Sequence, residues 1–145
     1  LRVFYQINGI YKYYNAMLYT LNPNDYFKKK TNLVIKNRPN HLLFKDFNPQ
    51  DKIIFGRSTF FILHPEFTPD LVVYSPLNIN FHDFLTKKKK NIRNVPIMTI
   101  NQISTGKVLT VSSSSFLTHD PYNGIDSGAN SKFLKNIVKW FLNSD

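Results

Sequence analysis

The 145-residue chain contains no cysteine, which excludes disulfide bonds, thiolate metal ligands and cysteine nucleophiles. Acidic residues are also few. Nine Asp and Glu, with Glu66 the single glutamate, stand against 19 Lys and Arg and leave a formal net charge of +10. No apolar run approaches the roughly 18 residues that a membrane-spanning helix needs. We therefore expect no membrane span and a polyanionic partner, nucleic acid first and an anionic membrane surface second.

Glycine is scarce as well: the chain has five, and none forms the Gly-rich pattern that cradles a phosphate. The four histidines lack the spacing of metal ligands: His41, His64, His82 and His119. Ser112 to Ser115, followed by His119 and Asp120, supply the residue types of a hydrolytic triad, but no Gly-x-Ser-x-Gly elbow accompanies them. We predict that the chain is not an enzyme and has no cofactor or metal site.

The length and the 42% hydrophobic content suit one domain with one core over residues 1–145. In residues 7–21 the apolar side chains recur every three to four positions, which predicts an amphipathic helix that ends before Pro23. Four short apolar runs between Pro and Gly residues predict strands. These runs cover residues 33–35, 42–44, 53–55 and 60–63.

The second half of the chain carries the clearest pattern. Residues 71–74 and 95–100 are continuous apolar runs, typical of strands covered on both faces, and residues 79–91 suit a helix between them. This order predicts a right-handed βαβ unit with parallel strands. Residues 107–111 predict a further strand. Residues 130–142 predict a helix whose core stripe is Phe133, Leu134, Ile137, Val138 and Phe141, and whose other face is Lys132, Lys135, Asn136 and Lys139.

Lysine and arginine gather in two clusters that suit the phosphates of RNA. The candidate RNA-binding residues are Lys28, Lys29, Lys30, Lys36 and Arg38 in the first cluster, and Lys87, Lys88, Lys89, Lys90 and Arg93 in the second. The alternative interpretation is a solvated surface, since cations also suit the C-terminal end of a helix.

Three motifs resemble parts of the bacterial-type small-subunit ribosomal protein two family. Pro69-Asp70-Leu71-Val72-Val73 resembles a family strand that begins with Pro-Asp. Asn94-Val95-Pro96-Ile97 resembles the next strand. Gly124-Ile125, Gly128 and Ser131 resemble the loop before the following helix. The order and rough spacing agree over residues 69–142, about half the chain, whereas residues 1–60 form a divergent N-terminal part.

The resemblance implies a flavodoxin-like three-layer α/β domain, with a mainly parallel sheet and flanking helices. It also implies a structural, non-catalytic component of the small ribosomal subunit that contacts ribosomal RNA and neighbouring ribosomal proteins, with no small-molecule substrate. Lys, Asn, Ile, Phe and Tyr are abundant, as AT-rich codons favour. We therefore expect a mitochondrial ribosome, or else another organelle or the cytoplasm of an AT-rich organism.

A second resemblance leads to a different class of function. The chain also resembles amidotransferase-like binding domains, in which a strand ends in a small polar loop before an Asn-led helix. The residues that carry this resemblance are Lys107-Val108-Leu109, Phe116-Leu117 and the helix from Asn130 to Phe141, with Asn136-Ile137-Val138-Lys139-Trp140 inside it. This resemblance implies a catalytically inactive scaffold or binding domain of a larger complex. An active hydrolase of that type would need the cysteine nucleophile that the chain lacks.

Overall fold

The computed structural model describes residues 16–19, 33–35, 38–56, 60–63, 69–83 and 88–143. They belong to two compact units. Unit 1 takes its described residues from the ranges 1–29 and 59–112, and unit 2 takes them from 30–58 and 113–145. The chain enters each unit twice, so segments far apart in sequence complete both.

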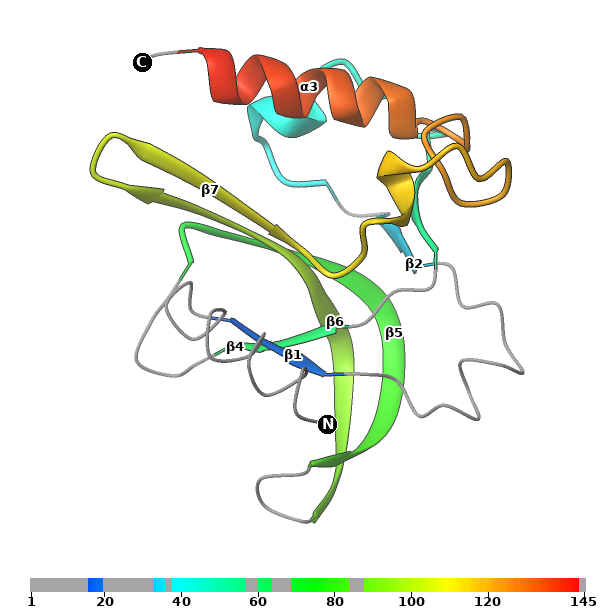
Figure 1. The fold of residues 1–145 in the computed structure, drawn as a ribbon. Helices are drawn as coiled ribbons and strands as arrows, with labels where there is room; N and C mark the ends of the chain where they lie inside the picture. The colour runs from blue at the N-terminus through cyan, green and yellow to red at the C-terminus, as the bar shows by residue number, and fades with distance from the viewer. Residues whose placement is uncertain are drawn as a thin grey trace. The chain divides into compact units, whose positions relative to one another are not determined.

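The described residues of unit 1 form antiparallel strands. The first pair is β1 (Ala16–Tyr19) with β4 (Phe60–Leu63). A three-stranded sheet contains β5 (Leu71–Asp83), β6 (Lys88–Ile103) and β7 (Gly106–Val111), with β6 in the centre and both neighbours antiparallel to it (Figure 1). Strand β4 lies against β6.

The antiparallel sheet shows that the predicted βαβ unit is wrong. Residues 79–83 and 88–91 are strand rather than helix, and Ile79 lies opposite Ile92 in a hairpin. Only four residues separate β5 from β6, whereas a parallel return needs a crossover of a dozen or more. The flavodoxin-like three-layer fold with a mainly parallel sheet is therefore also wrong.

The β5–β6 ribbon is bent, as Figure 1 shows, and two register shifts accompany the bend. Ile97 is an extra residue on β6 between the pairs Val73–Met98 and Tyr74–Pro96. The second shift lies at Asn94, which has a φ of 57°, a left-handed conformation that Asn tolerates better than most residues. Bulges increase local twist, and a bulge is also one of the few places where a sheet accepts proline.

The core of unit 1 surrounds one part of β6. Residues 95–101 of β6 are all buried, together with Val73 on β5 and Phe60 and Phe61 on β4. The apolar run at 95–100 therefore is a strand covered on both faces, as predicted. Strand β5 differs, because Tyr74 is exposed and only Val73 and Ser75 of residues 71–76 are buried.

Unit 2 combines a small sheet with helices. Strand β2 (Leu33–Ile35) pairs antiparallel with β3 (Ile53–Phe55), and the helical elements are η1 (Leu42–Phe44), η2 (Ser115–Leu117) and α3 (Asn130–Leu142). Four phenylalanines form the centre of the core. Phe133 on α3 lies 5.9, 6.2 and 5.8 Å, between ring centroids, from Phe44, Phe55 and Phe116.

Most of the other predicted elements are confirmed. Strands occupy residues 33–35, 53–55, 60–63 and 107–111 within the described chain, and α3 has the predicted bounds. The strand expected at 42–44 is wrong: these residues form a 3₁₀ helix, and the His41 side chain caps it. The helix expected over 7–21 is wrong at residues 16–19, which form β1, and the rest of it lies outside the described residues.

The two faces of α3 differ from the prediction. Phe133 and Ile137 are buried as expected, but Val138 and Phe141 from the same predicted stripe are exposed. Asn136, expected on the outer face, is buried instead. Its Nδ2 donates to the carbonyl oxygens of Leu43 and Lys45. These hydrogen bonds allow a polar amide to lie at a buried position of the helix.

Candidate nucleic-acid interface

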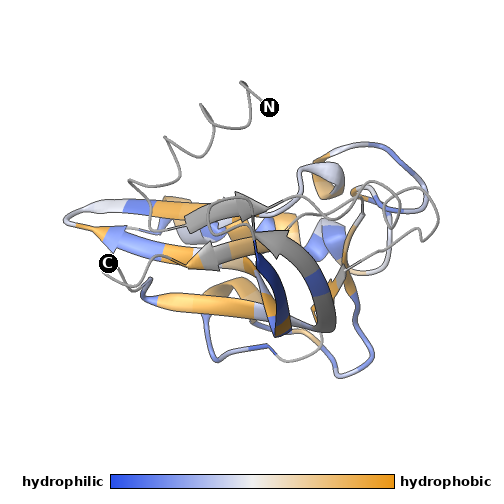
Figure 2. Ribbon diagram, turned by 90° about the horizontal axis from the view of Figure 1, so that it is seen from below, coloured by the Kyte–Doolittle hydropathy of each residue, from blue (hydrophilic) through white to orange (hydrophobic). Residues whose placement is uncertain are grey.

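Strands β5 and β6 continue beyond β7 as a two-stranded ribbon. Strand β7 pairs with residues 98–103 of β6, whereas residues 88–93 pair with β5 alone. We call residues 78–83 and 88–93 the basic arm. Its residues 88–91 and 93 are exposed, and Figure 2 colours the 88–91 segment as strongly hydrophilic, in contrast to the buried apolar residues that follow on β6.

The strand conformation places cations on both faces of the basic arm. Successive side chains of a strand point to opposite faces. Lys88 and Lys90 therefore lie on one face, and Lys89 and Arg93 lie on the other with Asn91 between them. In a helix, successive side chains would not alternate between two faces. The two-sided arrangement of the cations therefore follows from the hairpin.

Positive charge dominates this part of the chain. Residues 78–93 contain five Lys and Arg and one carboxylate, Asp83, which is opposite Lys88 in the register. Like charges at this density repel one another and favour an anionic ligand. The exposed Lys and Arg side chains are long enough to reach phosphates without a preformed pocket.

The basic arm also contains a pair of hydrogen-bonded asparagines that the sequence did not predict. Asn91 Nδ2 donates a hydrogen bond of 2.7 Å to Asn80 Oδ1, and the two residues are directly opposite in the register. Both are exposed. An alternating pattern of asparagine and apolar residues at 78–81 could have indicated the strand, but the apolar spacing of 79, 84 and 92 favoured a helix.

The structure brings four of the predicted RNA-binding residues together: Lys88, Lys89, Lys90 and Arg93 on the basic arm. Five others lie outside the described residues: Lys28, Lys29, Lys30, Lys36 and Lys87. Arg38 belongs to unit 2, and its guanidinium has structural partners. The basic arm is therefore the part of the predicted interface whose geometry the structure describes.

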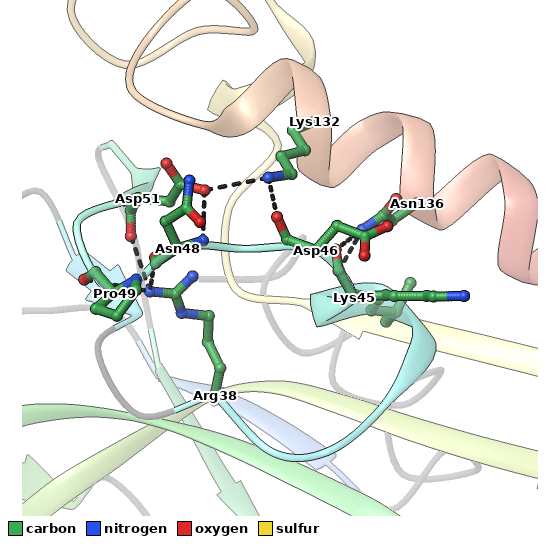
Figure 3. A network of polar contacts seen from close by, with 9 residues as sticks. Arg38, Lys45, Asp46, Asn48, Pro49, Asp51, Lys132 and Asn136 are labelled. Atoms are coloured by element: carbon green, nitrogen blue, oxygen red, sulfur yellow. Dashed lines mark hydrogen bonds and ion pairs between the residues drawn. The ribbon is translucent and has the colours of Figure 1, made fainter.

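Arg38 holds the loop that leads to β3 (Figure 3). Its Nη2 donates to the carbonyl oxygens of Asn48 at 2.8 Å, Asp51 at 3.1 Å and Pro49 at 3.5 Å. The guanidinium carbon also lies 5.3 Å from the ring centroid of Phe47, within the range of a cation–π contact. These bonds engage the group that would otherwise contact a phosphate, so Arg38 is not included in the basic arm.

Lys132 joins this loop to α3, as Figure 3 also shows. Its Nζ donates to the Asp46 carbonyl oxygen and lies 3.2 Å from Asp51 Oδ2. The Asn48 N–H donates to the same Asp51 carboxylate at 2.9 Å. This backbone hydrogen bond, together with Lys132, holds the pKa of Asp51 below its ordinary value of 3.8. The carboxylate therefore stays charged and fastens the loop.

The Ser, His and Asp side chains considered for a hydrolytic triad make hydrogen bonds or ion pairs within the loops of unit 2. Ser113 Oγ donates to the Gly56 carbonyl oxygen, and Ser115 Oγ accepts from the Gly56 N–H. Asp120 Oδ1 accepts from the backbone of Tyr122 and Asn123. His119 lies 3.7 Å from Asp126 at the surface. Within the described ranges, no three His, Asp or Glu residues group as a metal site would require.

No family model, curated protein or solved structure matches the chain. Among the residues that the structure describes, no helix is both long and apolar enough to cross a bilayer.

Proposed function

We propose that this chain binds RNA through its phosphate backbone, with the basic arm as the principal contact, and that it does so as a non-catalytic component of a ribonucleoprotein. The observation that carries the proposal is the exposed hairpin with Lys88, Lys89, Lys90 and Arg93 on its two faces. Phosphate contacts by such side chains supply most of the sequence-independent affinity for nucleic acid.

The particle that we propose is the small ribosomal subunit of a mitochondrion. The support for this choice is the set of ordered motifs in residues 69–142 and the net charge of +10. The observed sheet is antiparallel, unlike the sheet of that family, so similarity of fold is not part of the support. Partners under this proposal are ribosomal RNA and neighbouring ribosomal proteins.

A salt series tests the RNA proposal. Fluorescence anisotropy of the full chain with labelled single-stranded RNA gives the slope of log affinity against log salt, about −0.7 per contacted phosphate. The arm variant changes Lys88, Lys89, Lys90 and Arg93 to Gln. We expect it to reduce the magnitude of the slope by up to about 3.

The matched control removes the same charge from exposed positions elsewhere. It changes Lys45, Lys52, Lys135 and Lys139 to Gln, all of them exposed lysines of unit 2. We expect this variant to change the slope by less than about 1. Equal effects of the two variants on the salt slope would show that RNA binding depends on positive charge spread over the surface and not on the basic arm. Failure of the wild-type chain to bind RNA or co-sediment with small subunits at low salt would contradict the proposed function itself.

The second candidate is the catalytically inactive amidotransferase-like scaffold. A specific observation favours it: the chain runs from β7 through the polar residues 112–115 into η2 and then to α3, which begins at the buried Asn130. This order of elements is the one that the second resemblance implies. Co-purification of a protein complex without RNA would favour the scaffold over the RNA-binding proposal.

A further inference from the structure

Helix α3 has a second apolar stripe that does not face the core of unit 2. It consists of Leu134, Val138, Phe141 and Leu142, which share one side of a helix with 3.6 residues per turn. Val138, Phe141 and Leu142 retain 50%, 47% and 75% of their accessible surface, and Leu134 is half-buried. We call these four residues the outer stripe.

The core of unit 2 uses a different side of α3. Phe133 and Trp140 are buried, and the Trp140 ring meets the His41 ring edge-on at 5.8 Å between centroids. The Phe141 ring lies 4.7 Å, between centroids, from the Trp140 ring and still retains 47% of its accessible surface. Packing of unit 2 therefore does not account for the apolar character of the outer stripe.

Charge on α3 is arranged beside the outer stripe. Lys135 and Lys139 are exposed, and both lie three residues before a stripe residue, Val138 and Leu142 respectively, so they border it along one side. Helix α3 contains no acidic residue. The surface thus combines an apolar centre with a positive edge.

We propose that the outer stripe docks an amphipathic helix of a partner protein whose acidic residues lie against Lys135 and Lys139. The i, i+4, i+7 spacing is that of anchors in helix-to-helix recognition, and the four side chains span about 12 Å of the helix axis. The single row of lysines fixes the side on which the acidic residues of the partner lie. A helix resting in a lipid interface instead carries its cations across a whole polar face, and here the buried core of unit 2 occupies part of that face.

Photocrosslinking in the cell that makes the protein tests the partner. A benzophenone amino acid replaces Phe141 in the full chain, and a control chain carries it at Lys45, an exposed residue of the same unit. We expect adducts at position 141 and not at 45, and mass spectrometry should place them in a helical, acidic segment of another protein. Adducts with lipid, nucleic acid, a second copy of this chain or unit 1, or the absence of adducts, would overturn the proposal.

A binding measurement then tests the two parts of the recognition. A synthetic peptide of the crosslinked segment is titrated with the purified chain. We expect the Kd to rise about tenfold for Phe141→Ser, because the aromatic anchor of the stripe is lost, and by a similar factor for Lys135→Glu with Lys139→Glu. Val138→Lys serves as a second change in the stripe, and circular dichroism verifies that each variant remains folded.

The matched control for the charge reversal is Lys45→Glu with Lys52→Glu, at exposed positions outside α3. It should leave the Kd within about twofold of wild type. If both double variants weaken binding equally, or if Phe141→Ser has no effect, the outer stripe is not the docking site. These measurements do not involve RNA. Their failure would therefore not contradict the proposed RNA binding, which the salt series tests separately.

Discussion

The side chain of Asn130 hydrogen-bonds to both backbone groups of Ile54, a residue 76 positions away in the sequence. The Ile54 N–H donates to Asn130 Oδ1 at 2.8 Å, and Asn130 Nδ2 donates to the Ile54 carbonyl oxygen at 2.9 Å. Nδ2 also donates to the Gly124 carbonyl oxygen at 2.8 Å. The carboxamide thus pairs with β3 as a neighbouring strand would, and it fixes the beginning of α3 to the sheet of unit 2.

Replacement of Asn130 by alanine should destabilise the protein by about 2–4 kcal/mol, because it leaves partly buried backbone groups without their partners. Asn130→Asp should also destabilise, since a carboxylate keeps the acceptor but loses both donors. Urea unfolding of the full chain measures the effect. Asn91→Ala, the same change at an exposed asparagine, should cost less than about 0.5 kcal/mol. An unfolding midpoint for Asn130→Ala equal to that of wild type would contradict the structural role of this residue.

The four-phenylalanine core offers a second test with a matched control on one helix. Phe133 is fully buried among three other rings, so Phe133→Ala should cost about 3–5 kcal/mol. Phe141 retains 47% of its surface, and Phe141→Ala should cost about 1 kcal/mol or less. Thermal unfolding measures the stability of both variants. A similar loss of unfolding free energy for the two would show that both faces of α3 are packed.

His41 should make the stability of unit 2 depend on pH. Its Nδ1 accepts a 3.2 Å hydrogen bond from the Leu43 N–H, and burial lowers its pKa below the ordinary value of 6.5. The unfolded chain therefore binds more protons between the lowered pKa and 6.5, and the stabilisation that is complete above that range decreases as the pH falls through it.

The variant His41→Asn isolates this effect, because an asparagine can accept the same capping bond without titrating. We expect the free energy of unfolding of wild type to fall more than that of the variant between about pH 7.5 and pH 5.5. The other three histidines are common to both proteins, so the difference belongs to His41. Parallel pH profiles would contradict the prediction.

The two faces of the basic arm should both contribute to RNA binding. Changing Lys88 and Lys90 to Gln removes two cations from one face, and changing Lys89 and Arg93 to Gln removes two from the other. Since each face carries the same number of exposed cations, we expect each pair to reduce the salt slope by about 1.4. An effect confined to one pair would show that the arm lies with a single face on the RNA.

Some elements could be predicted from the sequence because their residue pattern fits only one kind of secondary structure. Helix α3 has the predicted bounds, because apolar spacing over thirteen residues suits no strand. The apolar run at 95–100 is a buried strand, since seven consecutive buried residues of β6 contain it. The positive charge that defines the basic arm was also visible, as were its four exposed cations, Lys88, Lys89, Lys90 and Arg93.

The pairing of these elements, and the sides that they expose, depend on contacts between distant residues, which a local pattern does not contain. Ile79 and Ile92 suited a helix by spacing, but the two residues lie opposite each other on paired strands, and this cross-strand pairing outweighs local spacing. Val138 and Phe141 are apolar like Phe133, yet only Phe133 meets the other rings. Burial depends on which surface lies opposite a residue, and in this chain that surface is supplied by segments distant in sequence, as Ile54 is from Asn130.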